Sequence, residues 1–256
     1  MNKEGISILP YIYITVPTYT LFAMIGAVFA IVCLFVRMED YQIRFRDLML
    51  YLVIGIIGLL LIARLVFAIA MIPSMENVSL QNFCHYLFYG GIVFYGGLLG
   101  LLGSVALVAK IKKHDLNHIY NYMAPAIPLF HAWARIGCLF AGCCYGKEWN
   151  WGVVMAATPD VIRFPVQVVE SICNVLIFIT LLIYEKHQRE EKHILVVYLI
   201  LYAVCRFILE FFRGDQERGI WGIISTAQII SLGILFFLCI RVWVKKKVTQ
   251  NEKREN

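Results

Sequence analysis

Three arginines lie inside long apolar segments, where a charged side chain is costly. They are Arg64, Arg135 and Arg206. An arginine at the centre of a membrane helix costs about 2.5–3.5 kcal/mol on insertion scales, so each of the three needs an anionic partner or a polar cavity. The three segments are alternate ones and run in the same direction. At ~1.5 Å per residue, Arg64 and Arg135 lie about 24 Å along their segments and Arg206 about 18 Å, so we expect them at a similar depth.

Carboxylates and other polar groups are expected at the same depth. Arg206, Glu210 and Arg213 follow one another at i, i+4 and i+7, which is one helix face. His131 precedes Arg135 by one turn. The remaining members come from other segments and are Tyr19, Tyr95, Gln167, Glu170 and Gln228. The pattern predicts an arginine-lined pocket, and guanidinium groups match the phosphate of an anionic lipid headgroup. The alternative is that each arginine extends separately to the membrane surface.

The segments that position these residues indicate an all-α integral membrane protein. The 256 residues are 61% apolar and only 16% charged, whereas a soluble domain has about a quarter of its residues charged. Seven apolar runs approach the ~20 residues that cross a bilayer as a helix. We predict membrane spans at Thr18–Val36, Leu48–Ile72, Phe88–Ala109, Ile119–Leu139, Val166–Tyr184, Ile194–Phe212 and Ile220–Val242. One transmembrane domain over 1–256 is expected, with no cleavable signal peptide and a basic cytoplasmic tail at 244–256.

Basic residues concentrate on one side of these spans. Fifteen basic residues follow the first, third, fifth and last spans. They are Arg37, Arg44 and Arg46 after the first span, Lys110, Lys112 and Lys113 after the third, Lys186, Arg189 and Lys192 after the fifth, and Arg241, Lys245, Lys246, Lys247, Lys253 and Arg254 at the last. The opposite side has only Lys3, Lys147, Arg163, Arg213 and Arg218. The positive-inside rule then places the amino terminus outside and the carboxyl terminus in the cytoplasm. The net charge of +6 reflects this topology and gives no indication of nucleic-acid binding.

Several motifs resemble those of the prolipoprotein diacylglyceryl transferase family. The segment 122–146, which contains His131-Ala-Trp-Ala-Arg135-Ile-Gly-Cys138, resembles the family's signature stretch. Arg206-Phe-Ile-Leu-Glu210-Phe-Phe-Arg213 matches its Arg-Phe-x-x-Glu-Phe-Phe-Arg pattern, and Tyr95-Gly96-Gly97-Leu-Leu-Gly100 is similar to its His-Gly-Gly-Leu-x-Gly segment. Tyr19-Thr-Leu-Phe, Arg64, Arg163-Phe-Pro-Val-Gln167-Val-Val-Glu170 and Ser225-Thr-Ala-Gln228 correspond in the same order. The resemblance therefore covers nearly the whole chain.

The resemblance implies an enzyme in the cell membrane with its active site toward the outer leaflet. It implies that the diacylglyceryl group of phosphatidylglycerol passes to the lipobox cysteine of a prolipoprotein signal peptide, without a metal or other cofactor. Arg135 and Arg206 are expected to act on the phosphate, Glu210 to orient Arg206, and Arg213 to guard the pocket mouth. Gly96 and Gly97 would let lipid or backbone approach closely, or would serve helix packing. The oligomeric state is left open.

Three positions depart from the family pattern. Tyr95 stands where the family has a histidine, and Cys138 and Cys143 stand where its signature has Asn and Glu. Because a tyrosine with a pKa near 10 is a poor base at neutral pH, we expect Tyr95 to position the substrate. We consider that His131 partly takes the role of base, against the alternative of a packed helix residue. These changes also leave room for a different acceptor.

The cysteines allow further alternatives. Cys84, Cys138, Cys143 and Cys144 are expected on the outer side, where a disulfide among them is permitted. The Cys-x4-Cys-Cys spacing differs from that of structural zinc sites and no histidine pair accompanies it, so no metal is predicted. A membrane thiol oxidoreductase would use these cysteines but would leave the arginines unexplained. A transporter would be expected to have internal repeats, which we do not find.

Overall fold

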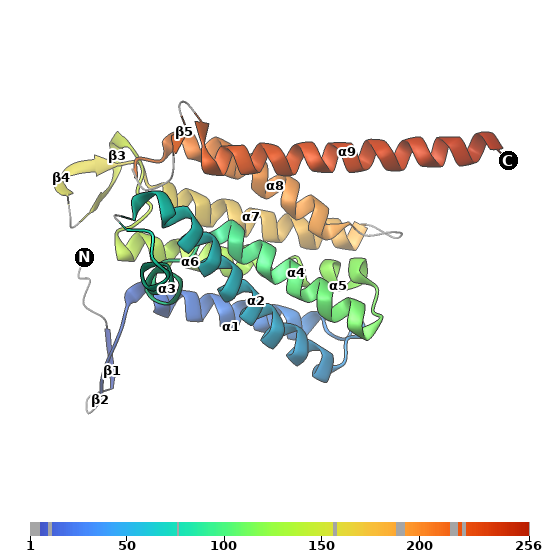
Figure 1. Ribbon diagram of the computed structural model, residues 1–256, viewed down its shortest axis with the longest axis horizontal. Coiled ribbons are helices and arrows are strands. Elements are labelled where there is room, and N and C mark those ends of the chain that lie inside the picture. Colours follow the sequence, from blue (N-terminus) through green and yellow to red (C-terminus); the bar gives the residue numbers. More distant parts are fainter. Residues whose placement is uncertain are drawn as a thin grey trace. The chain divides into compact units, whose positions relative to one another are not determined.

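The computed structural model describes residues 6–9, 12–75, 77–155, 158–187, 193–215, 220–221 and 224–255. Figure 1 follows the elements in chain order. The chain divides into two compact units, one made of residues 1–35 and 123–256 and the other of residues 36–122. Each unit has its own set of packed helices.

The first unit contains most of the residues that the sequence analysis selected. Its helices are α1 (Thr18–Arg37, of which the last two residues belong to the second unit), α6 (Ala126–Ala141), α7 (Val166–His187), α8 (Ile194–Leu209) and α9 (Thr226–Glu255). Helix α6 packs against α7, α7 against α8, and α8 against α9. Aromatic stacking joins α1 to α6, with ring centroids of Phe22 and Phe140 5.0 Å apart and those of Phe29 and Trp133 also 5.0 Å apart.

In the described residues, antiparallel strand pairs precede α1 and lie between α6 and α7 and between α8 and α9. The strands pair as β1 (Ile6–Leu9) with β2 (Ile12–Val16), β3 (Glu148–Met155) with β4 (Thr158–Arg163), and β5 (Ile220–Trp221) with β6 (Ile224–Ser225). A 3-10 turn, η2 (Glu210–Phe212), extends α8. Rings from this region cluster, because Phe164 stacks on Phe212 at 4.9 Å and Trp149 meets both edge-on.

The second unit contains α2 (Phe45–Met71), η1 (Ile72–Ser74), α3 (Leu80–Tyr89), α4 (Phe94–Lys112) and nearly all of α5 (Leu116–Met123). Glycines let α2 and α4 approach closely. A Cβ on Gly100 would overlap the carbonyl oxygen of Gly58, and one on Gly96 would lie 3.0 Å from the Val66 Cβ. Small residues at matching positions are a general device for close packing of membrane helices.

Six helical segments are long and apolar enough to cross a membrane. They are Thr18–Arg37, Phe45–Met71, Phe94–Lys112, Leu116–Ala141, Val166–His187 and Ile194–Phe212. Many of their apolar side chains are exposed, for example Val36, Leu61 and Leu99 at 60–73%. A soluble protein would bury such continuous apolar faces. The chain is therefore a helical multi-pass membrane protein, as its composition predicts.

Three predicted spans differ from the observed helices. The span predicted at 88–109 is wrong at its start, since α3 ends at Tyr89 and α4 begins at Phe94 after the glycine pair 90–91. The span predicted at 119–139 is interrupted at Ala124–Pro125, because proline cannot donate the backbone hydrogen bond that a continuous helix requires. The helix predicted as the last span, α9, begins at Thr226 rather than Ile220, because Ile220–Trp221 and Ile224–Ser225 pair as strands β5 and β6. Its apolar part, Thr226–Arg241, is shorter than the six candidate spans.

Candidate active site

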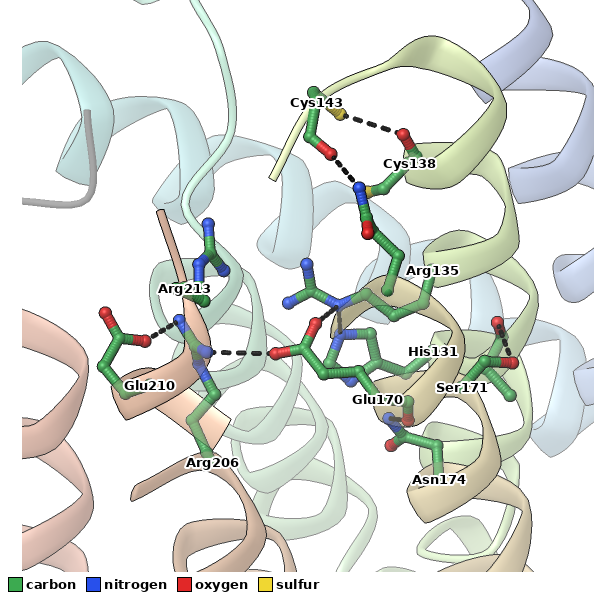
Figure 2. A network of polar contacts seen from close by, with 12 residues as sticks. His131, Arg135, Cys138, Cys143, Glu170, Ser171, Asn174, Arg206, Glu210 and Arg213 are labelled. Atoms are coloured by element: carbon green, nitrogen blue, oxygen red, sulfur yellow. Dashed lines mark hydrogen bonds and ion pairs between the residues drawn. The ribbon is translucent and has the colours of Figure 1, made fainter. Parts of the chain in front are cut away.

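Glu170 joins two of the three arginines that the sequence analysis selected. It lies in the second turn of α7, and one carboxylate oxygen is 2.7 Å from Nε of Arg135 on α6. The other oxygen is 3.0 Å from Nη1 of Arg206 on α8. One carboxylate thus bridges two guanidinium groups from two other helices (Figure 2). The prediction that Arg135 and Arg206 meet opposite Glu170 is confirmed.

Arg206 is held on two sides. Its Nη2 is 2.6 Å from a carboxylate oxygen of Glu210, four residues later on the same face, as the i, i+4 spacing predicted. Its Nη1 is paired with Glu170. Since both terminal nitrogens face carboxylates, Arg206 is fixed in position, and its role at the phosphate stays a prediction.

Arg135 differs from Arg206 in that only its Nε faces a carboxylate among the described residues. Its Nε donates to Nε2 of His131 at 3.1 Å and faces Glu170. Among the residues that the structure describes, no hydrogen bond or ion pair joins its two Nη nitrogens to a protein acceptor, and in Figure 2 they lie on the side of Arg213. Two parallel N–H donors of this kind match two phosphate oxygens.

The cluster is buried, and its charges balance within it. Arg135 and Arg206 are each 8% exposed, and Glu170 and Glu210 are 4% and 2% exposed. Burial of an unpaired charge is expensive, so two guanidinium groups require the two carboxylates.

Further hydrogen bonds hold the helices around the cluster. Ser171 Oγ donates to the Ala132 carbonyl at 3.0 Å and ties α7 to α6. Asn174 donates to the backbone carbonyl of Glu170 at 2.8 Å. The Tyr202 ring of α8 lies 5.4 Å from the His131 ring. A cavity of about 10 Å³, lined by several of these residues and by Cys173 and Cys205, lies beside Glu170 and Arg206 and has space for one water molecule at most.

His131 is positioned by the cluster in a way that sequence reasoning did not anticipate. Its Nε2 accepts the hydrogen bond from Arg135, and its side chain is buried. A base needs a lone pair that faces the proton it removes. The observed geometry therefore favours a role in orienting Arg135, while a role as base stays a prediction.

Arg213 does not continue the face of α8 as predicted. The helix tightens into η2 and ends, and Arg213 has extended backbone with φ −77° and ψ 140°. Its guanidinium pairs with both carboxylate oxygens of Asp215, a residue that sequence reasoning missed although it lies only two positions away. The backbone here also joins the 145–147 segment, since Gly214 N donates to Tyr145 O at 3.0 Å.

Gln167, Gln228 and Tyr19 also lie in this unit. Gln167 is fully buried and donates to the carbonyl of Cys143 at 2.9 Å. Gln228 forms a capping box with Ser225, because each side chain accepts from the other residue's backbone N–H, at 3.0 and 3.3 Å. The Tyr19 ring lies against Gly137 of α6. Their substrate-binding roles stay predictions.

Four selected residues belong to the second unit. Arg64 donates to the backbone carbonyl of Phe88 at 2.6 Å. Tyr95 contacts the neighbouring Phe94 ring edge-on at 5.7 Å. Gly96 and Gly97 are buried against α2, so the helix-packing interpretation accounts for both. The predicted meeting of Arg64 with Arg135 and Arg206 stays a prediction.

Three cysteines lie close together beside this cluster, one in the last turn of α6 and two directly after the helix. The sulfur atoms of Cys138, Cys143 and Cys144 all lie within 4.8 Å of one another. None of the four cysteines expected on the outer side, which are these three and Cys84, forms a disulfide in this structure. Thiol hydrogen bonds from Cys138 and Cys143, together with the nearby Arg135 and Arg213, lower the pKa of Cys144.

Comparison with known proteins gives one consistent result. The family model described as prolipoprotein diacylglyceryl transferase matches residues 7–244. The chain is similar to the phosphatidylglycerol–prolipoprotein diacylglyceryl transferase of Clostridium tetani, with 33% identity over 75% of this chain and 77% of that protein. It is also similar to the protein of that name from Legionella pneumophila strain Paris, with 26% identity over 89% of this chain and 92% of that protein.

Proposed function

Since the chain belongs to the prolipoprotein diacylglyceryl transferase family, we propose that it transfers the sn-1,2-diacylglyceryl group of phosphatidylglycerol to the lipobox cysteine of a prolipoprotein. The products are a thioether-linked diacylglyceryl protein and glycerol phosphate. The names of the relatives support both substrates. The observation that carries the proposal is the guanidinium of Arg135, which a buried ion-pair cluster holds through Nε while its two Nη donors have no protein acceptor among the described residues.

The chemistry requires that negative charge be stabilised as the phosphate leaves. The thiolate sulfur attacks the glyceryl C3, the S–C bond forms, and the C–O bond to phosphate breaks with its electron pair on the oxygen. A phosphodiester with one negative charge becomes a phosphomonoester that can hold two. Arg135 then binds the leaving group more strongly than the ground state, which is the condition for catalysis.

The other residues of the cluster keep Arg135 in place. Glu170 holds its Nε side, His131 accepts from the same nitrogen, and Arg206 anchors Glu170. Arg206 also contributes positive potential to the phosphate. Substrate binding in this proposal further involves Tyr95, Arg64, Gly96, Gly97, Tyr19, Gln167, Gln228, Glu210 and Arg213.

The topology follows from the charges on the loops. Seven spans, with α9 as the last, place the amino terminus outside and the carboxyl terminus in the cytoplasm. The end of α6 near Ala141 and the start of α7 near Val166 then face outward, together with the 142–165 segment. Phosphatidylglycerol enters from the outer leaflet of the cell membrane, and a secreted precursor meets it there. A different acceptor is not favoured by the names of the relatives.

The test uses purified full-length protein in detergent with phosphatidylglycerol and a synthetic lipobox peptide. Mass spectrometry should detect a diacylglyceryl thioether on the cysteine peptide and none on a peptide with serine at that position. Arg135→Lys keeps the charge but loses the bidentate fork, and we expect the rate to fall at least 100-fold. Asp160→Asn, on the exposed face of β4, is the control and should retain the parent rate. An unmodified peptide with the parent protein, or full activity of Arg135→Lys, would overturn the proposal.

A further inference from the structure

The sulfur atoms of Cys138, Cys143 and Cys144, at the carboxyl end of α6, form a cluster that the transfer mechanism above does not use. Cys138 is buried in the last turn of α6, Cys144 is half-buried, and Cys143 is exposed. Their separations of at most 4.8 Å compare with about 3.8 Å between thiolates on one tetrahedral zinc ion, which follows from a Zn–S distance of ~2.3 Å. Rotation of side-chain torsions closes that difference.

The backbone at the end of α6 explains why the sulfur atoms converge. Gly142 ends the helix in the left-handed conformation, with φ +72°, and its N–H reaches back to the carbonyls of Cys138 and Leu139. The N–H of Cys143 also donates to the Cys138 carbonyl, at 3.1 Å. A helix that ends in this way brings together the side chains on either side of the bend. Here these are the side chains of Cys143, directly after the glycine, and Cys138, four residues before it.

Cys144 adopts a conformation that a cysteine rarely takes. Its φ is +55°, one of three positive values outside glycine in the described chain. The left-handed region costs a residue with a Cβ about 1–2 kcal/mol. The turn is held in spite of this cost, because Gln167 donates to the Cys143 carbonyl from its buried position on α7. A second left-handed residue two positions after Gly142 directs the third sulfur toward the other two.

The surroundings suit a cluster of negative charge. Three thiolates with a divalent ion carry one net negative charge, and Arg135 and Arg213 lie close enough to interact electrostatically with the Cys144 sulfur. Sulfur ligands select soft ions such as Zn²⁺ over Mg²⁺ or Ca²⁺. No fourth His, Cys, Asp or Glu from the described residues joins the group, and Cys143 is exposed. Three protein ligands with one open position are characteristic of reactive rather than structural zinc sites.

We propose that Cys138, Cys143 and Cys144 form a binding site for Zn²⁺ with a fourth position open to an external thiol. The external thiol is the acceptor cysteine, an assignment that rests on the proposed transferase function. The acceptor thiol binds through sulfur, its proton passes to solvent, and the metal-bound thiolate forms the S–C bond as the C–O bond to phosphate breaks. This role would replace the base that Tyr95 is poorly suited to provide, and it departs from the metal-free chemistry that the family resemblance implies.

The metal site is tested on the full-length protein in detergent, purified under reducing conditions. One equivalent of Co²⁺ should produce thiolate-to-cobalt charge-transfer absorption and the strong visible bands of a tetrahedral ion, and Zn²⁺ should displace it. Cys143→Ser should weaken Co²⁺ binding at least 10-fold, and replacing all three cysteines should abolish the bands. Cys239→Ser, exposed on α9, is the matched control. Co²⁺ binding is compared only among variants whose thermal unfolding temperature equals that of the parent protein.

Two results would overturn the metal site. One is a Co²⁺ spectrum without charge-transfer bands, or one that survives replacement of the three cysteines. The other is a disulfide within the cluster of the purified protein that re-forms after reduction in the presence of Zn²⁺. Neither result depends on transferase activity.

The thiol assignment has its own readout. A lipobox peptide should shift the Co²⁺ bands as a fourth sulfur binds, whereas the serine peptide should leave them unchanged. Removing the ion with a chelator should lower the transfer rate at least 10-fold, and Zn²⁺ should restore it. An unchanged rate without metal would overturn the thiol role while the proposed function stands, and no transfer under any condition would overturn the function itself.

Discussion

Replacing Glu170 with glutamine tests the central feature of the site. The change keeps the side chain's size and removes the charge that faces Arg135 at 2.7 Å and Arg206 at 3.0 Å. Removing one partner of a buried ion pair costs about 3–5 kcal/mol, because the other charge stays buried without compensation. Arg206 retains Glu210 at 2.6 Å. We therefore expect the cost of one broken pair, that of Arg135, rather than of two.

The expected loss is measurable by thermal unfolding in detergent. At ~2–4 °C per kcal/mol for a chain of this size, a loss of 3–5 kcal/mol lowers the unfolding temperature by roughly 10 °C. The five tryptophans provide a fluorescence signal. Transfer to the lipobox peptide should fall at least 100-fold even at temperatures where the variant is folded, because Arg135 loses its orientation.

Two comparisons make the result decisive. Asp160→Asn removes an exposed carboxylate from β4 and should change the free energy of unfolding by less than about 1 kcal/mol. The unfolding temperature should therefore shift by less than about 2–4 °C. Glu170→Asp keeps the charge but shortens the reach, and its effect should lie between those of the parent and Glu170→Gln. If Glu170→Gln unfolds at the parent temperature and retains its rate, the two arginines do not depend on this carboxylate and the reasoning about the site is wrong.

Three further predictions address neighbouring features. His131→Gln should retain the transfer rate within 10-fold and leave its pH profile unchanged, because the amide oxygen can still accept from Arg135 Nε. His131→Leu should lose the transfer activity. If both variants lose the activity equally and the pH profile changes, His131 acts as a base. Gly100→Ala should lower the unfolding temperature because its Cβ would overlap the Gly58 carbonyl, while Gly103→Ala, with open space around it, should not. Ser225→Ala removes the capping box of α9 and should destabilise the protein by about 0.5–2 kcal/mol in urea unfolding, with Ser104→Ala as a hydroxyl control inside α4.

The sequence alone determined the class of the protein and its pairs along one helix. Apolar runs near 20 residues predicted helices in a membrane, because a helix of that length crosses the bilayer and satisfies its backbone hydrogen bonds internally. The spacing of Arg206 and Glu210 predicted their ion pair, because residues four apart are neighbours on a helix. The cost of buried charge also predicted that Arg135 and Arg206 would need anionic partners or a polar cavity.

Local backbone chemistry limited other predictions. The end of α8 at Leu209 removed Arg213 from the predicted face, since helical spacing no longer applies after the chain becomes extended. Ile220–Trp221 and Ile224–Ser225 pair as strands although their apolar composition suits a helix, because a run of apolar residues has no period that distinguishes a strand from a helix. Gly142 is a residue type that often ends a helix, but the glycine alone does not place Cys143 over Cys138, since that placement depends on the turn that the backbone takes there.

Only the tertiary structure decided which groups are engaged and which are available. It placed one carboxylate of α7 between two arginines from α6 and α8, so that Arg206 is held on both sides while Arg135 keeps its fork for a ligand. It also brought together three sulfur atoms of cysteines whose spacing in the sequence, Cys-x4-Cys-Cys, differs from that of structural zinc sites. Such arrangements depend on how helices pack and on how a turn directs its side chains. Periodicity in the sequence describes one element at a time and does not contain that information.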